Sequence, residues 1–108
     1  MKISLAQINP TVGDLKSNYK LIVKHAKIAR DSNTEILITP ELSICGYPPE
    51  DLLLNKDFLQ ECHIYLLKIA REFPRLKIIV GHPRSHKGLL YNSASILYKG
   101  KIEKTYDF

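Results

Sequence analysis

Two short runs of strand-forming residues, each preceded by an amphipathic segment, constrain the fold of this chain more than any other feature. The runs are residues 35–39 and 77–80, and after a charged first residue both are apolar or β-branched throughout. Such runs are typical of strands buried on both faces of a sheet. A third segment, residues 3–8, ends at Asn9-Pro10 and predicts another strand followed by a turn. Strands that alternate with helical segments predict an α/β fold with parallel neighbours.

The two helical segments show apolar residues at intervals of three and four, which is the spacing of an amphipathic helix. These residues are Leu15, Tyr19, Ile22, Val23, Ala26 and Ala29 in the first segment, and Phe58, Cys62, Tyr65, Leu66, Ile69, Ala70 and Phe73 in the second. Asp14 and Ser17 offer N-cap chemistry to the first helix, and Pro74 closes the second. The segment between them, residues 41–55, predicts a loop that is rich in proline yet unusually apolar.

The C-terminal part predicts antiparallel strands. Leu89 to Tyr98 and Lys101 to Tyr106 are strand-like runs, and Lys99-Gly100 between them predicts a hairpin turn. We expect the strand at residues 77–80 to stop at Gly81 and Pro83, and we interpret Gly81, Gly88 and Gly100 as turn glycines. The predicted order is therefore β-α-β-α-β followed by a β-hairpin.

The charge of the chain invites a nucleic-acid interpretation, because the net charge is +5 and the pI is near 9.3. However, Lys16, Lys20, Lys24 and Lys27 recur at helical spacing opposite the apolar positions, without interleaved aromatic residues. This pattern favours a solvated helix face, so no nucleic-acid partner is expected. The alternative is a small basic nucleic-acid binder.

Membrane insertion and export are not indicated either. No apolar run is long enough to span a bilayer, and the N-terminus has no secretory signal. Two cysteines are too few for a disulfide framework. We therefore expect a cytoplasmic protein without membrane contact.

Glu41 is the residue most suggestive of chemistry, because it follows a predicted buried strand at its C-terminal end. Open α/β sheets place their ligand sites there. Ile38, Leu42 and Ile44 flank Glu41, and partial desolvation would raise the pKa of its carboxylate towards the range of a general base. The alternative is an ordinary loop carboxylate or a helix N-cap partner.

Several motifs occur in one order along the chain. They are ISLAQINPTVGD at residues 3–14, TPELSICGYPPEDLL at 39–53, GHP at 81–83, YNSA at 91–94 and KGKI at 99–102. The second is similar to the P-E-x-x-x-x-G-Y-P-P-E-D-L-L signature of the glutaminase domain of glutamine-dependent NAD synthetases. The whole series resembles the N-terminal part of that domain, within the nitrilase (carbon-nitrogen hydrolase) superfamily.

This resemblance implies the N-terminal portion of a nitrilase-type α/β/β/α sandwich. Family members hydrolyse amides with a Glu, Lys and Cys triad, in which a thiolate attacks the carboxamide and ammonia leaves. By resemblance, Glu41 is the general base and Tyr47 lines the glutamine pocket. For Tyr47 the alternative is an aromatic plug that stiffens a proline-rich loop.

The chain departs from the family pattern at the other two triad positions. The register from Gly100 places the family Lys at Phe108, which cannot donate to an oxyanion, and Lys101 and Lys104 are out of register. The family Cys comes still later, whereas Cys45 fits packing and Cys62 lies on an apolar helix face. We therefore expect residues 1–108 to be a partial glutaminase domain, truncated before the Lys and Cys and not catalytic alone.

The resemblance also bears on cofactors and partners. ATP and deamido-NAD would bind a separate synthetase domain that is missing here, so no cofactor is expected. No metal is expected, because His25, His63, His82 and His86 form no recognised ligand set and a turn at Pro83 should separate the last two. Glutamine would be the substrate of the complete domain.

A second hypothesis is a non-catalytic remnant of a truncated or frameshifted reading frame, or an interaction module. Strands patterned for burial on both faces would expose apolar surface in the isolated chain. Self-association or pairing with a complementary chain is then expected.

Overall fold

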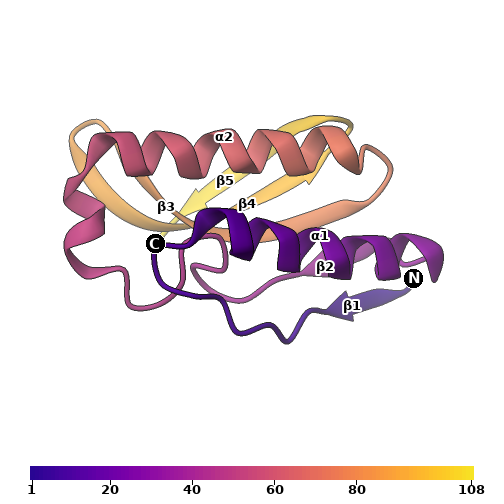
Figure 1. Ribbon diagram of the computed structural model, residues 1–108. Helices are drawn as coiled ribbons and strands as arrows, with labels where there is room; N and C mark the ends of the chain where they lie inside the picture. Colours follow the sequence, from indigo (N-terminus) through magenta and orange to yellow (C-terminus); the bar gives the residue numbers. More distant parts are fainter.

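The computed structural model describes residues 1–108 and shows one five-stranded sheet with two long helices on the same face (Figure 1). The elements in chain order are β1 (Ile3–Leu5), α1 (Leu15–Asp31), β2 (Ile36–Ile38), the 3₁₀ turn η1 (Glu50–Leu54), α2 (Lys56–Glu72), β3 (Lys77–His86), β4 (Leu89–Tyr98) and β5 (Lys101–Asp107). Neither helix has the length and apolar character needed to cross a membrane.

The strands follow one another across the sheet in chain order, β1-β2-β3-β4-β5. β1, β2 and β3 are parallel, and α1 and α2 form the two crossovers between them. β3, β4 and β5 are antiparallel. The predicted α/β fold and the predicted order of its elements are therefore confirmed.

Side-chain caps fix where both helices begin. The Asp14 carboxylate accepts a hydrogen bond from the backbone N–H of Ser17 at 3.1 Å, and this contact lowers the pKa of Asp14. α2 begins after Asn55, whose Oδ1 accepts from the N–H groups of Asp57 at 2.9 Å and Phe58 at 3.2 Å. Both caps satisfy N–H groups that have no partner inside the helix.

The core lies between the helices and one face of the sheet. Leu37, Ile78 and Leu97 are register neighbours on this face, and each is no more than 2% exposed. They belong to one apolar cluster with Ile22 of α1 and Leu66 of α2. We call this side the helix face of the sheet.

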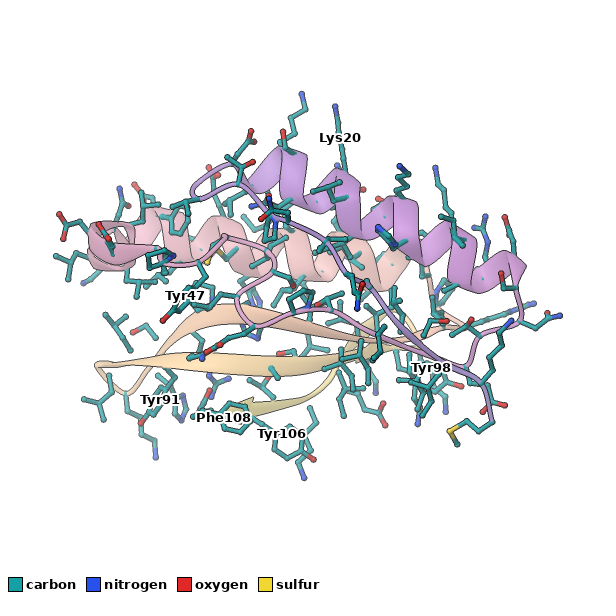
Figure 2. The ribbon with its side chains drawn as sticks, turned by 90° about the horizontal axis from the view of Figure 1, so that it is seen from below. Lys20, Tyr47, Tyr91, Tyr98, Tyr106 and Phe108 are labelled. Carbon is teal, nitrogen blue, oxygen red and sulfur yellow. The ribbon has the colours of Figure 1, made fainter.

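The opposite side, which we call the open face, is also apolar. Its register neighbours Ile38, Ile79 and Ile96 are partly exposed. Figure 2 shows Tyr106 and Phe108 on this side, with both helices beyond the other side of the strands. The expected exposure of apolar sheet surface is therefore present in these 108 residues.

β3 is longer than expected, and the prediction that it stops at Gly81 and Pro83 is wrong. The strand continues to His86, with Pro83 opposite Asn92 of β4. β2 ends at Ile38, so this part of β3 has no strand on its other side. Proline is tolerated at such an edge because its missing N–H would have had no partner.

The sequence pattern predicted a turn glycine at Gly88 but not the hairpin in which Lys87-Gly88 joins β3 to β4. The φ angles of these two residues are 51° and 79°, and those of the predicted turn Lys99-Gly100 are 54° and 77°. Two central residues with positive φ are typical of the type I′ turns that close tight hairpins. Gly88 and Gly100 are therefore turn glycines as predicted, whereas Gly81 lies inside a strand.

Candidate functional site

Glu41 and Asn92 come together on the open face from distant parts of the sequence. Glu41 lies in the loop that leaves β2, and Asn92 lies in β4. The side-chain amide of Asn92 donates a hydrogen bond from Nδ2 to Oε1 of Glu41. The structure thus joins two of the motifs noted in the sequence, the P-E element and the Y-N-S-A element.

The expectation that Glu41 is partly desolvated is wrong for this chain, in which the residue is exposed. Its apolar neighbours in sequence do not cover it. Leu42 and Ile44 are buried in the core, so their side chains pack away from the carboxylate.

A cleft of about 440 Å³ surrounds Glu41 on the open face. Its lining includes Pro40, Gly81 and Ala94 beside Glu41 and Asn92, and it also includes Phe108. The backbone N–H of Phe108 donates to the carbonyl of Asn92 at 2.9 Å. Phe108 therefore lies in the Glu41 cleft, and it is the residue at which counting from Gly100 placed the family Lys.

Gly81 allows the Glu41 loop to cross β3 at close range. A Cβ atom at Gly81 would lie 2.5 Å from both the carbonyl oxygen of Pro40 and the backbone nitrogen of Leu42. No side chain fits between these backbones. Leu42 itself has a φ of 50°, and non-glycine residues held in this region cluster at functional sites.

The buried side chain of Asn18 in α1 holds the same loop from the other side. Its Oδ1 accepts from the N–H of Thr11 at 2.7 Å, and its Nδ2 donates to the carbonyls of Thr11 at 2.8 Å and Ile44 at 3.0 Å. A further bond of 2.9 Å runs from the N–H of Gly13 to the carbonyl of Cys45. The loop after β2 is therefore tied to α1 and to the turn that precedes it.

Tyr47 is not brought into the Glu41 cleft in this chain. It lies at the far end of the same loop, 67% of its surface is exposed, and it does not line the cleft. Its part in binding glutamine stays a prediction.

The two cysteines are free and fully buried, as expected for packing residues. Burial raises the pKa of the Cys45 thiol to about 11 and that of Cys62 to about 12. The thiolate, which is the nucleophilic form, is therefore strongly disfavoured in both.

A series of hydrogen-bonded polar side chains lies on the helix face of β3, β4 and β5. Nδ1 of His82 is 3.2 Å from the carbonyl oxygen of Pro83, which can only accept, so Nδ1 carries the proton. Nε2 then accepts from the Ser95 hydroxyl at 2.6 Å, and Ser95 Oγ accepts from Thr105 at 2.7 Å. Burial lowers the pKa of His82, and Arg84 and His63 add to this effect.

The structure corrects the interpretation of the histidine pair. His82 and His86 lie on one continuous strand, without a turn between them, and His82 is buried whereas His86 is exposed. No group of three or more His, Cys, Asp or Glu residues lies close enough together to hold a metal ion.

Asn92 belongs to the Y-N-S-A element, but the sequence pattern predicted no role for it. Its amide is the direct partner of Glu41. One signal could have found it: Asn92 carries a side-chain amide, and its motif resembles the same family as the P-E element that contains Glu41. What was lacking was the extension of β3 beyond Gly81, which sets the pairing of Pro83 with Asn92.

Comparison with known proteins gives one consistent result. The sequence profile of the family described as carbon-nitrogen hydrolase matches residues 2–107. The glutamine-dependent NAD(+) synthetase of Xanthomonas campestris pv. campestris is 41% identical over 107 residues, which cover 98% of this chain and 19% of that protein. The synthetase of Thermotoga maritima is 37% identical over 108 residues, covering 98% of this chain and 19% of that protein. The chain thus spans about a fifth of the length of these relatives.

Solved structures agree with this result. A glutamine-dependent NAD(+) synthetase from Cytophaga hutchinsonii superposes with a TM-score of 0.91 and 31% identity, over 95% of this chain and 18% of that one. An amidase from Nesterenkonia sp. shares the fold, with a TM-score of 0.86 and 23% identity over 99% of this chain and 42% of that one. The resemblance drawn from the motifs is confirmed, and the chain belongs to the carbon-nitrogen hydrolase family.

Proposed function

We propose that the chain forms the N-terminal part of a glutamine amidohydrolase domain, in which Glu41 is the general base. In the complete protein this domain would release ammonia from glutamine for NAD synthesis. The observation that carries the proposal is the Glu41 cleft, where Asn92 orients the carboxylate and position 108 lies beside it. The relatives from Xanthomonas campestris and Thermotoga maritima, which are glutamine-dependent NAD(+) synthetases, support this substrate.

The chemistry requires Glu41 to take a proton from a thiol as its sulfur attacks the carboxamide carbon, and to return that proton to the nitrogen. The C–N bond then breaks, ammonia leaves and a thioester remains, which water hydrolyses to glutamate. Asn92 uses one N–H to fix the orientation of Oε1, which leaves Oε2 free to accept the thiol proton. Asn92 is therefore a positioning residue in this proposal. Tyr47 would line the glutamine pocket of the complete domain.

We also propose that these 108 residues do not hydrolyse glutamine by themselves. Both cysteines are buried and hold their protons tightly, so neither supplies a thiolate. The residue at the cleft position of the family Lys is Phe108, which has no side-chain donor. The partly exposed isoleucines of the open face indicate that further protein covers it, as a continuation of the domain, a complementary chain or a second copy.

The test is a chimera in which this chain replaces the corresponding segment of the Xanthomonas campestris relative. We expect the chimera to release ammonia from glutamine and the isolated chain to stay at background. In the chimera, Glu41→Gln should lower kcat by roughly 10²- to 10⁴-fold, the usual contribution of a general base. Asn92→Ala should lower kcat by up to about 10²-fold, because misplacing a catalytic group by an ångström can cost that much.

Glu103→Gln is the matched control, since it makes the same change at an exposed position on β5. An active chimera that keeps its rate after Glu41→Gln would refute the role of Glu41. Ammonia release by the isolated chain that Glu41→Gln abolishes would show that a residue within it, with Cys45 the first candidate, serves as nucleophile.

A further inference from the structure

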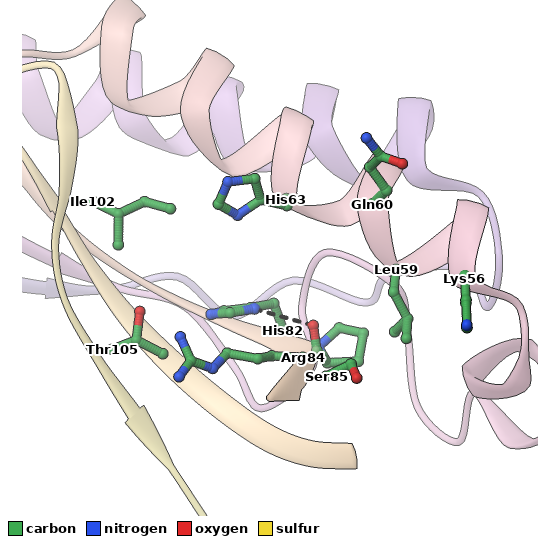
Figure 3. A pocket seen from close by; sticks show the side chains of 10 residues that line it. Lys56, Leu59, Gln60, His63, His82, Arg84, Ser85, Ile102 and Thr105 are labelled. Atoms are coloured by element: carbon green, nitrogen blue, oxygen red, sulfur yellow. Dashed lines mark hydrogen bonds between the residues drawn. The ribbon is translucent and has the colours of Figure 1, made fainter. Parts of the chain in front are cut away.

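A second cavity lies on the helix face, opposite the Glu41 cleft. It has a volume of about 590 Å³, within the range of roughly 300–1,000 Å³ that is typical of small-molecule sites. Figure 3 shows α2 as its roof, carrying Lys56, Gln60 and His63, and β3 and β5 as its floor, carrying Arg84, Ser85 and Thr105. It shares no lining residue with the Glu41 cleft.

Arg84 is held on this floor by one end of its guanidinium. Its Nε lies 3.1 Å from Oδ1 of Asp107, and the same oxygen accepts a hydrogen bond of 2.6 Å from Ser93. The Nε–H is nevertheless misdirected, so the buried Nε atom has no hydrogen-bond partner. The two Nη groups make no hydrogen bond within the chain, and the side chain keeps 32% of its surface exposed. Figure 3 shows the guanidinium beside Thr105 and below His63.

The other polar groups around the cavity are mainly donors. Lys56 carries an ammonium group, Gln60 offers an amide and Ser85 offers a hydroxyl, whereas the Thr105 hydroxyl already donates to Ser95. None of the ten lining residues has a carboxylate. Asp107, the acid nearest to the guanidinium, is already shared between Arg84 and Ser93. An excess of donors without a competing acid favours an anionic ligand.

The free edge of a guanidinium matches two oxygens of one oxyanion. A carboxylate has only those two oxygens and a single charge. A phosphate group has further oxygens for the imidazole of His63 and the hydroxyl of Ser85, and a second charge for Lys56. We propose that this cavity binds the phosphate group of a small molecule and that Arg84 makes the principal contact with it.

The test uses the ¹⁵N-labelled 108-residue chain, titrated with inorganic phosphate at constant ionic strength maintained with sodium chloride. We expect saturable shifts of the backbone amides of Arg84, Ser85 and Thr105, with a Kd on the order of 1 mM for phosphate alone. Acetate, the carboxylate probe, should bind at least about tenfold more weakly, because it makes fewer charge-assisted hydrogen bonds.

Arg84→Gln should weaken phosphate binding by about tenfold or more, because it removes the charge and the two-pronged donor. Arg84→Lys should give a smaller loss, since it keeps the charge only. Arg75→Gln is the matched control: it removes the same charge at an exposed position outside the cavity, and binding should change by less than about twofold.

His63→Ala keeps the test decisive if the Arg84 variants fail to fold, because His63 is exposed and its removal leaves the core intact. It should weaken phosphate binding by about threefold, the loss of one moderate hydrogen bond. Absence of saturable shifts would overturn the proposal, as would equal binding by the parent chain and a folded Arg84→Gln variant. Acetate binding as tight as that of phosphate would overturn the choice of ligand.

Discussion

Neighbouring rows on the helix face of the sheet are equally buried but chemically opposite. One row consists of Ile78, Leu97 and Ile102, which are register neighbours on β3, β4 and β5. The next begins with Val80 and continues with Ser95 and Thr105. The row after that is polar throughout and contains His82, Ser93 and Asp107. Within a few residues, the same three strands pass from a hydrocarbon core to a polar network.

The difference shows that burial alone does not define a core. Side chains in the apolar row stabilise the fold by leaving water, and they need shape rather than partners. Buried groups in the polar rows need partners, and both ring nitrogens of His82 and the hydroxyls of Ser93 and Ser95 have them. The network adds little net stability per bond but fixes positions. The apolar row should therefore contribute most to the free energy of unfolding, whereas the polar row orients Arg84 at the second cavity.

The largest expected effect comes from cutting into the apolar row. Ile78→Ala should lower the free energy of unfolding by about 3–4 kcal/mol, because it leaves a cavity among fully buried neighbours. Ser95→Ala in the adjacent row should cost about 1–2 kcal/mol, since it leaves one ring nitrogen of His82 without a partner. Urea unfolding of both variants measures the two losses. Equal losses would remove the distinction between the rows.

The apolar part of the fold was predictable because it repeats a period. Apolar residues at three-and-four spacing define α1 and α2, and the continuous runs define β2 and the first half of β3. The capping of α2 by Asn55 is not part of any periodic pattern and was missed. The second half of β3 was missed for a different reason: Gly81 and Pro83 are usual strand breakers, and only the tertiary environment shows that they are tolerated there.

The candidate site was predictable in part. Glu41 stood out because it follows a buried strand and belongs to a recognisable motif. Its partner Asn92 and the place of Phe108 in the cleft were not predictable in the same way. Both depend on the register of the sheet, and the sequence pattern predicted too short a strand for β3. The environment of Glu41 could not be read from its neighbours, because the backbone reverses at Leu42 and sends the flanking apolar side chains into the core.

Gly81 lies on β3 between Val80 and His82, where the buried rows change from apolar to polar. Its substitution gives the second-largest expected effect. Gly81→Ala should lower the free energy of unfolding by about 2–3 kcal/mol, because the new Cβ would meet backbone atoms of Pro40 and Leu42 that cannot easily move. The Glu41 loop should shift at the same time and weaken the hydrogen bond from Asn92. Amide shifts of residues 41–44 and of Asn92 measure this displacement by NMR.

Gly88→Ala is the control for Gly81→Ala. Its Cβ would meet nothing within 4 Å, so it bears only the cost of a φ of 79°, about 1 kcal/mol. It should leave the amide shifts of residues 41–44 unchanged. If Gly81→Ala were as mild as Gly88→Ala, the close crossing of the Glu41 loop over β3 would not be a constraint on the fold.

The smallest expected effect is a pH dependence that belongs to the polar row. The pKa of His82 lies below its ordinary value of 6.5 in the folded chain, because burial opposes the charged ring. Above 6.5 the ring is neutral in both states, so stability is unaffected. As the pH falls from 6.5 to the folded pKa, the unfolded chain binds a proton that the folded chain does not. Stability is then lost at a rate of up to about 1.4 kcal/mol per pH unit.

Urea unfolding at about pH 7.5 and about pH 5.5 measures the loss, in the window where His82 is the buried ring that resists protonation. His82→Gln should flatten the difference between the two pH values, whatever it does to stability at neutral pH. His86→Gln, which removes an exposed imidazole from the same strand, should leave the difference in place. The converse result, with the dependence kept by His82→Gln and removed by His86→Gln, would show that the polar row admits water and is not a closed network.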